Sequence, residues 1–202
     1  GIATFSSASD FILERVQVSQ TGSESLLLEG SGHSIIASSF SGQASFQDGA
    51  SLVTEDTTFD EFNLSSQEGA YLENVSANYL TISGGSNILL RDSSFATLLS
   101  LDGNSLDNRA LDTTFGSISC ESGSTLAIEY RTVIELRTVQ GAGNWLEIEV
   151  TEDSTGWYDQ VVYSTSFFGG GEPLTDEEGL LPELLIAGLV YNGSSTPGPA
   201  VT

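Results

Sequence analysis

Ser38-Ser39-Phe40 is the first copy of a phrase that this chain repeats, in which two hydroxyl residues precede an aromatic ring. The last residues of its six copies are 19, 20, 16, 20 and 18 positions apart. So short a unit cannot bury its own apolar face and must stack on its neighbours, so this period indicates a solenoid. The other full copies are Thr57-Thr58-Phe59, Ser93-Ser94-Phe95 and Thr113-Thr114-Phe115, and the degenerate ones are Ala77-Asn78-Tyr79 and Arg131-Thr132-Val133.

A second column keeps the same rhythm, because a glycine is followed three positions later by an aliphatic residue. This occurs seven times, from Gly32 and Ile35 to Gly143 and Leu146. Two columns with one period predict a single core ladder through the stacked coils. Its members are Phe40, Phe59, Tyr79, Phe95, Phe115, Val133, Leu52, Leu72, Ile88, Leu106 and Leu126.

The secondary structure of each unit is predicted to be strand. Apolar residues alternate, or come in runs of three to five, between Gly, Asn, Asp and Ser, and no helical stripe of useful length is present. The leucine-rich repeat phrase is missing. The sequence therefore predicts an all-β fold, a parallel β-helix (β-solenoid) of about six to seven coils of about 18 to 19 residues, each adding a layer of about 4.8 Å.

Three segments are expected along the chain. Residues 1–21 are interpreted as an N-terminal cap, and residues 22–150 as the solenoid, with an irregular first coil. Residues 151–202 are interpreted as a β-rich C-terminal cap. Because Thr175 and Glu178 have the spacing of a capping box, a short helix is expected to begin at Asp176. An apolar strand over 184–191 and a Gly/Ser/Pro tail follow.

Composition limits the classes of partner. Five arginines, no lysine and 28 acidic residues give a net charge of −23, which disfavours nucleic acid and anionic lipid. The longest apolar run, residues 184–191, falls far short of the roughly 20 residues that span a membrane, so no insertion is expected. An acidic, Ser/Thr-rich surface suits an extracellular or cell-surface protein whose export signal has been removed.

Two arginines raise the hypothesis of an enzyme. Arg91 beside Asp92 and Arg109 near Asp107 lie about one coil apart. Right-handed β-helix polysaccharide lyases and hydrolases place similar charges on adjacent coils of one face, so the resemblance implies glycan cleavage as a third hypothesis. The polygalacturonase phrases are missing, and surface charge pairing is the favoured interpretation, with no catalytic residue and no cofactor assigned.

The remaining candidates for chemistry are isolated. His33 is the single histidine and is expected at the surface, and Cys120, the single cysteine, is expected to be a small buried residue in phase with Phe46 and Ile82. The stretch 102–107 resembles a calcium loop but lacks its ligand spacing, so a turn is favoured over a calcium ion.

Surface features suggest contacts with other molecules. Period-two alternation predicts one outward row of polar residues, and ice binding by this row is disfavoured because aspartates border it. Three sequons would accept glycans in a glycosylating host, at Asn63, Asn74 and Asn192. The apolar strand is a candidate subunit contact through Leu184, Leu185, Ile186, Leu189 and Val190. The outward row is expected to hold Ser39, Thr58, Asn78, Ser94, Thr114 and Thr132.

Repeat and composition together resemble the β-solenoid portions of secreted and cell-surface proteins, namely adhesins, autotransporter passengers and filament subunits. The resemblance covers about residues 22–150 and implies a non-enzymatic extracellular structural protein. Its coils or terminal strands are expected to self-assemble into a surface filament or layer. The alternative is a single-copy adhesin that binds a surface glycan.

Overall fold

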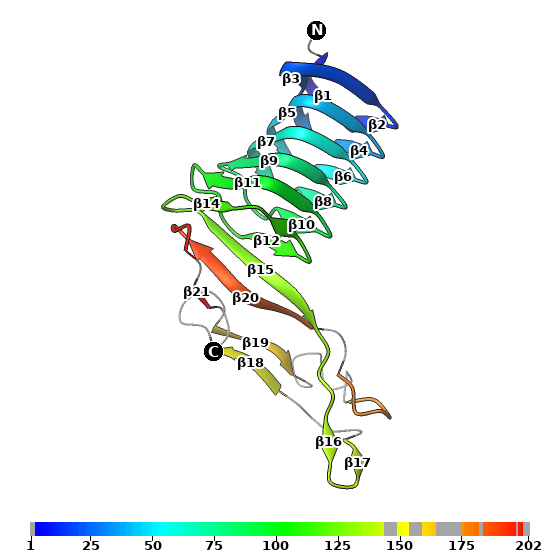
Figure 1. Cartoon of the computed structure of the whole chain (residues 1–202), viewed down its shortest axis with the longest axis vertical. Coiled ribbons are helices and arrows are strands. Elements are labelled where there is room, and N and C mark those ends of the chain that lie inside the picture. Colours follow the sequence, from blue (N-terminus) through cyan, green and yellow to red (C-terminus); the bar gives the residue numbers. More distant parts are fainter. Residues whose placement is uncertain are drawn as a thin grey trace. The chain divides into compact units, whose positions relative to one another are not determined.

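The fold is a parallel β-solenoid of about six turns, as the repeat predicts. A computed structural model describes residues 3–143, 149–153, 159–164, 175–181, 184–196 and 198–199. These fall into two compact units, Gly1–Ile128 with Tyr191–Pro197, and Glu129–Val190 with Gly198–Thr202. The first unit is the solenoid (Figure 1).

One face of the solenoid is a sheet of long strands in parallel register. Its path runs β1-β3-β5-β7-β9-β11-β13, and β14 also pairs with β11. The register shifts within β5, between Phe40 and Gln43, and within β11, between Phe95 and Leu98, where the strands are irregular. The bounds are β1 Ala3–Ser9, β3 Gln17–Ser31, β5 Ser39–Ala50, β7 Thr58–Glu68, β9 Ser76–Ser83, β11 Ser94–Asp102, β13 Thr114–Phe115 and β14 Ile118–Cys120.

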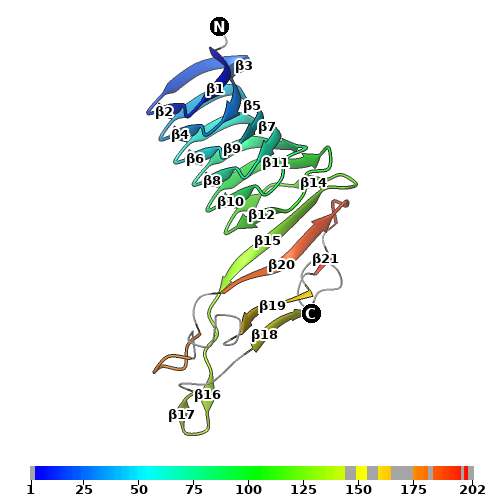
Figure 2. The same ribbon diagram turned by 180° about the vertical axis from the view of Figure 1, so that it is seen from behind.

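A second sheet is built from one short strand per coil, and Figure 2 shows it from behind. Its path runs β2-β4-β6-β8-β10-β12-β15. In the three-residue strands only the central side chain is directed inward, as the buried Ile35, Leu72 and Leu90 show. The bounds are β2 Ile12–Glu14, β4 Ser34–Ile36, β6 Val53–Glu55, β8 Tyr71–Glu73, β10 Leu89–Arg91, β12 Asn108–Leu111 and β15 Thr125–Thr132.

Left-handed residues turn the chain at fixed places in each coil. The corner after the short strands has φ values between 47° and 56° at every layer. Glycine, asparagine and aspartate tolerate this conformation best, which explains why Asp and Asn recur there. The corner residues are Arg15, Ala37, Asp56, Asn74, Asp92 and Asp112.

The interior of the solenoid is a stack of in-register side chains. Phe40 pairs with Phe59, Phe95 pairs with Phe115, and Ala77 links the two pairs in one column. The rings are stacked, with centroids 5.3 Å apart for Phe40 and Phe59 and 5.9 Å for Phe95 and Phe115. Burying one such ring contributes on the order of 1.5–3 kcal/mol, so the column is a main source of stability.

Three residues of the predicted ladder lie outside the core. Tyr79 is exposed because Ala77 occupies the aromatic position of its coil, and Tyr79 pairs in register with Glu61, which is also exposed. Leu106 is 44% exposed at an isolated bridge outside the strands. Val133 is 62% exposed because the chain has left the solenoid by that point.

The aliphatic residues that the glycine pattern aligns occupy two different positions in the coil. Leu72 lies in the centre of β8, whereas Leu52 and Ile88 precede β6 and β10. All three are buried, as are Leu126, Phe40, Phe59 and Phe95, whereas Phe115 is half-buried.

The solenoid boundaries differ from those expected. Residues 3–21 already belong to the stack, because β1 pairs with β3 and β2 with β4 in parallel, so this segment is not a separate cap. At the other end the first unit stops at Ile128 and not at 150. The hydrogen-bonded parallel ladder of β1 and β2, which the aromatic phrase does not record, sets the first of these limits.

Beyond the solenoid, three strand pairs are antiparallel among the described residues. In the sheet, β15 is followed by β20 (Leu184–Asn192) and then by β21 (Gly198–Pro199), which is antiparallel to β20. β16 (Arg137–Thr138) pairs with β17 (Gly141–Ala142), and β18 (Glu149–Asp153) pairs with β19 (Asp159–Ser164).

The helix expected at Asp176 is not formed in the described residues of this unit. The Asp176 carboxylate accepts hydrogen bonds from the N–H groups of Glu178 and Leu180, at 3.0 and 2.8 Å. Asp176 N also donates to Leu180 O, which closes a turn. The turn places Gly179 O where Leu136 N donates to it, and Leu181 N donates to Ile134 O, so the segment after the turn pairs with residues 134–136 in place of a helix.

Candidate functional site

Charged side chains form a cluster on the outer face of the short-strand sheet. In-register stacking places Glu55, Glu73 and Arg91 in one outward column on β6, β8 and β10. Parallel layers are about 4.8 Å apart, so the neighbouring carboxylates Glu55 and Glu73 repel each other. Arg91 in the next layer balances part of that charge.

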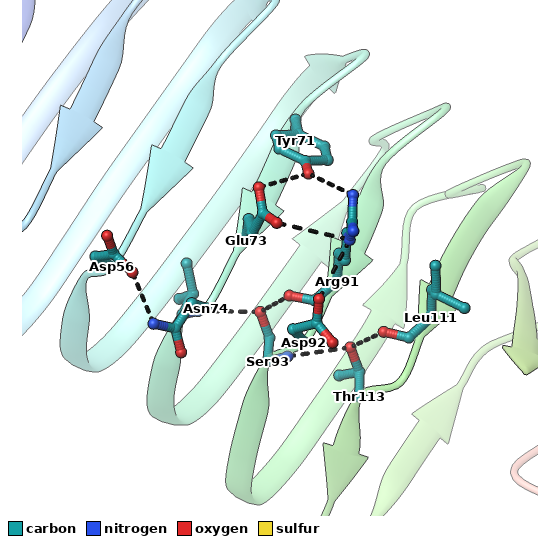
Figure 3. Close-up of polar contacts among 10 residues, drawn as sticks. Asp56, Tyr71, Glu73, Asn74, Arg91, Asp92, Ser93, Leu111 and Thr113 are labelled. Atoms are coloured by element: carbon teal, nitrogen blue, oxygen red, sulfur yellow. Dashed lines mark hydrogen bonds and ion pairs between the residues drawn. The ribbon is translucent and has the colours of Figure 1, made fainter. Parts of the chain in front are cut away.

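Figure 3 shows the closed network around Arg91. The Tyr71 hydroxyl donates to Glu73 Oε2 at 2.7 Å, and Arg91 Nη1 donates to the Tyr71 oxygen at 3.5 Å. Arg91 Nε lies 3.6 Å from Glu73 Oε1 and donates to Asp92 Oδ2 at 3.2 Å. The cation is thus shared by two carboxylates and a phenol.

The network changes the proton affinity of its members. Burial, followed by the hydrogen bond to Glu73, raises the pKa of Tyr71 above its ordinary value of 10.0. The hydrogen bond to Tyr71 is the main cause that raises the pKa of Arg91. Both shifts favour the protonated phenol and the charged guanidinium.

The two arginines of the enzyme hypothesis do not form one column. Arg91 pairs with Leu111, whereas Arg109 pairs with Leu89. They therefore lie at opposite ends of the three-residue ladder of β10 and β12. Asp92 contacts Arg91 at one corner, and Asp107 occupies a left-handed corner before β12.

Beneath this face, the first hydroxyl of each repeat holds the corner together. Ser93 Oγ donates to Arg91 O at 2.7 Å and accepts from Val75 N at 3.0 Å. In the next layer, Thr113 Oγ1 donates to Leu111 O and accepts a hydrogen bond from Ser93 N (Figure 3). Ser38 and Thr57 make the same contacts with Ile36 O and Glu55 O. The phrase is therefore a corner motif, which sequence spacing alone does not show.

The second hydroxyl of each repeat is directed outward. Thr58 Oγ1 donates to Ser39 Oγ at 3.0 Å, and Thr114 Oγ1 donates to Ser94 Oγ at 3.1 Å. Ser76, not Asn78, occupies this row in the intervening coil. Asn78 lies two positions further on and donates to Asp60 Oδ1 at 2.7 Å. Thr132 lies in the second unit.

The stretch expected to form a turn does so. Gly103 and Asn104 have φ values of 60° and 62°. The buried Ser105 hydroxyl donates to Asp102 O at 2.6 Å, and its oxygen also lies 2.9 Å from Ile82 O. In the part of the chain that the structure describes, no group of three or more His, Cys, Asp or Glu residues is placed to hold a metal ion.

His33 is buried, with 3% of its surface exposed, and not at the surface as expected. It occupies the position before β4 that Leu52 occupies before β6 and Ile88 before β10, which is inward in every coil. Its Nε2 lies 3.4 Å from Glu29 O, and its Nδ1 has no hydrogen-bond partner among the described atoms. Cys120 is buried in register with Leu101, and through it with Ile82, as predicted.

The three sequons differ in placement. Asn63 is half-buried on β7, whereas Asn192 is exposed at the end of β20. Asn74 is exposed at a corner, and its side chain donates to Asp56 Oδ1 at 2.7 Å (Figure 3).

The expected subunit contact lies on β20. Leu189 is half-buried and Val190 is 9% exposed, and the side chains of Leu184, Leu185 and Ile186 lie outside the described ones. None of the described segments forms a helix long and apolar enough to cross a membrane.

Corner columns and interior polar residues were missed by the sequence interpretation. Asn108 is fully buried, accepts from Ile88 N, and donates to Gly85 O and Thr125 O. The signal in the sequence that could have revealed these positions was the recurrence of Asp, Asn, Gly and Ser at the coil period.

Comparison with protein families, with known proteins and with solved structures finds no match to this chain.

Proposed function

We propose that this chain is a non-enzymatic structural protein of the cell exterior, a rigid β-solenoid that self-assembles into a surface filament or layer. The observation that carries this proposal is the continuous in-register ladder of the first unit, where the left-handed corner recurs in each layer from Arg15 to Asp112. In such a stack each coil contacts only the coil before it and the coil after it, so the structure extends along one axis. Its long outer faces are available for contact with other subunits.

Electrostatics favour an exterior location and a structural role. The net charge of −23 keeps the surface hydrated and disfavours contact with nucleic acid or anionic lipid. Arg91, a candidate for catalysis, is bound by Glu73, Asp92 and Tyr71. These contacts account for the position of Arg91 in the fold, and no catalytic role is needed to explain it.

Electron microscopy of the purified 202-residue chain, with light scattering, tests the proposal. Filaments, layers or defined oligomers are expected, and persistent monomers at high concentration would contradict self-assembly. Release of reducing ends from acidic or neutral polysaccharides, lost in Arg91→Ala, would contradict the non-enzymatic role. Arg137→Ala, which removes another exposed arginine paired with Glu135, is the matched control.

A glycan-binding adhesin remains the second candidate because one face combines exposed hydroxyls with an exposed ring. Thr58, Ser76 and Ser94 are exposed in one row, and Tyr79 is 42% exposed on the next part of the same sheet. Aromatic rings and hydroxyls are common contacts for sugars. Binding to a glycan array that Tyr79→Ala abolishes would support this candidate, and binding unaffected by that change would contradict it.

A further inference from the structure

Tyr79 places an aromatic ring on the outer side of the long-strand sheet. Its side chain is 42% exposed, and Ala77 already fills the inward column of the same coil. In register, Tyr79 stands between Glu61 of β7 and the half-buried Leu98 of β11, and Figure 1 shows β9 and β11 side by side. Tyrosine is enriched at protein interfaces, where its ring serves as an anchor. The outward side of these two strands, the β9–β11 face, is therefore a candidate contact surface.

A column of uncharged polar side chains runs beside this pair. Four of its members, one each on β7, β9, β11 and β14, are half-buried on the outer side of the sheet. Among the described residues, no hydrogen bond within the chain engages their side chains. Their donors and acceptors are therefore available to another molecule. The four are Asn63, Thr81, Ser100 and Ser119, in register.

The β9–β11 face is close to neutral in a chain whose net charge is −23. β9 contains no charged residue, and β11 contains one, Asp102. The corners and the short-strand sheet, in contrast, carry Asp56, Glu73 and Asp112. Two copies of so acidic a chain repel each other, and this repulsion is weak where the facing surfaces carry little charge. A neutral face thus suits a second copy as its partner.

We propose that the β9–β11 face binds the same face of a second copy of this chain, related by a twofold axis that runs along the strands between the two sheets. This symmetry makes the solenoid axes antiparallel and places β9 of each copy opposite β11 of the other. Tyr79 of one copy then packs on Leu98 of the other, and the reverse. The junction rests on the proposed self-assembly and supplies one of its contacts.

The register makes this arrangement self-complementary. Ser83 and Asp102 are paired in adjacent layers, so across the junction the hydroxyl of Ser83 meets the carboxylate of Asp102. Glu61, in the layer before β9, meets the layer after β11, where the exposed hydroxyl of Ser117 lies. Neither carboxylate faces another carboxylate.

The size of the overlap predicts a weak, reversible contact. Four layers about 4.8 Å apart, with strands of about eight residues at about 3.3 Å each, give roughly 500 Å² per copy, which is the low end for specific interfaces. Because a twofold contact is closed, a filament requires a further contact elsewhere.

Sedimentation velocity over a wide concentration range compares two double variants with equal added charge. Asn63→Asp with Ser100→Asp places carboxylates inside the overlap, two layers apart. Ala37→Asp with Asn87→Asp is the control, because both residues are exposed at left-handed corners, a conformation that aspartate tolerates. Wild type and control are expected to dimerise equally. The dissociation constant is expected to rise about tenfold or more in the overlap variant and in Tyr79→Ala.

A spin label at Gln17 tests the antiparallel arrangement without changing the junction. Gln17 is exposed on β3, three layer steps from β9, and the axis lies half a step further on. Two labels in one dimer are therefore seven steps apart, about 34 Å along the solenoid axis. Pulsed electron paramagnetic resonance of Gln17→Cys in a Cys120→Ala background is expected to show this distance. A much shorter distance would overturn the arrangement.

The outcomes separate the junction from the proposed function. Assemblies that persist unchanged in the overlap variant and in Tyr79→Ala would overturn the junction alone. Binding of a neutral glycan that Tyr79→Ala abolishes while dimerisation is unchanged would assign the ring to a sugar and would also overturn the junction. A wild type that is monomeric at every concentration would overturn the proposed self-assembly as well.

Discussion

Ser93 joins two layers of the solenoid, because its hydroxyl accepts the main-chain N–H of Val75 from the preceding coil while it donates to Arg91 O in its own. Val75 is fully buried, so no solvent reaches that N–H group. The hydroxyl therefore satisfies a donor and an acceptor at once, and the repeat of Ser or Thr at this place follows from main-chain requirements.

Ser93→Ala is expected to lower the free energy of unfolding by about 1–3 kcal/mol, because it leaves the buried N–H group of Val75 without an acceptor. Urea unfolding followed by circular dichroism measures the change. Ser94→Ala is the control, since Ser94 is exposed and a change within about 0.5 kcal/mol is expected. Equal losses in the two variants would argue against the corner role of Ser93.

Ala37 has a φ of 50° at a corner where the four following layers carry Asp or Asn. Alanine is disfavoured in this conformation, so Ala37→Asn is expected to raise the free energy of unfolding by about 0.5–1 kcal/mol. Ser76→Asn, in the extended part of β9, tests whether asparagine stabilises in general, and no increase is expected there. A loss of stability in Ala37→Asn, measured by urea titration, would contradict the assigned corner conformation.

His33 occupies a core position with an unsatisfied Nδ1 among the described atoms. His33→Leu is expected to raise the free energy of unfolding by about 1 kcal/mol, because it removes the buried polar atom and keeps the volume close to that of Leu52 in the next layer. His33→Ala leaves a cavity and is expected to lower it. If His33→Leu destabilises the protein in thermal unfolding, the imidazole has a partner that this explanation omits.

Stability at alkaline pH is expected to depend on Tyr71. Its pKa in the folded state is raised above 10.0 by burial and by the hydrogen bond to Glu73, so folding favours the protonated phenol. This contribution is fully present below the unfolded value and is lost as the pH rises through the folded-state pKa. Tyr71→Phe should therefore flatten the loss of unfolding free energy above pH 10.0 and remove one component that titrates above pH 10.0 from the tyrosinate absorbance curve. An unchanged titration curve would contradict the contacts of Tyr71.

The sequence was sufficient to predict the solenoid and much of its core. Aromatic recurrence predicts the column of Phe40, Phe59, Phe95 and Phe115 because in-register stacking repeats one environment at every layer. It failed at Tyr79, where a spacing of 16 residues in the pattern masks the fact that Ala77 fills the column and the ring lies outward.

Other errors arose because a single chain pattern does not record hydrogen bonding between layers. The capping-box spacing at Thr175 predicts a helix, but Asp176 begins a turn whose last residues hydrogen-bond to residues 134–136. His33 looks like a surface residue in a Gly- and Ser-rich stretch, although its position in the coil is inward. Such residues are placed by register, which becomes visible only when the corners are aligned.

The distance between spin labels at Gln17 and Thr114 tests the rigid stack most directly. Both side chains are exposed, and they stand in one outward row separated by five layer steps. Five spacings of about 4.8 Å predict a distance of about 24 Å. With Cys120→Ala as the background, pulsed electron paramagnetic resonance is expected to give one narrow distribution near that value. A broad distribution, or one centred far from it, would contradict a rigid solenoid and the structural function built on it.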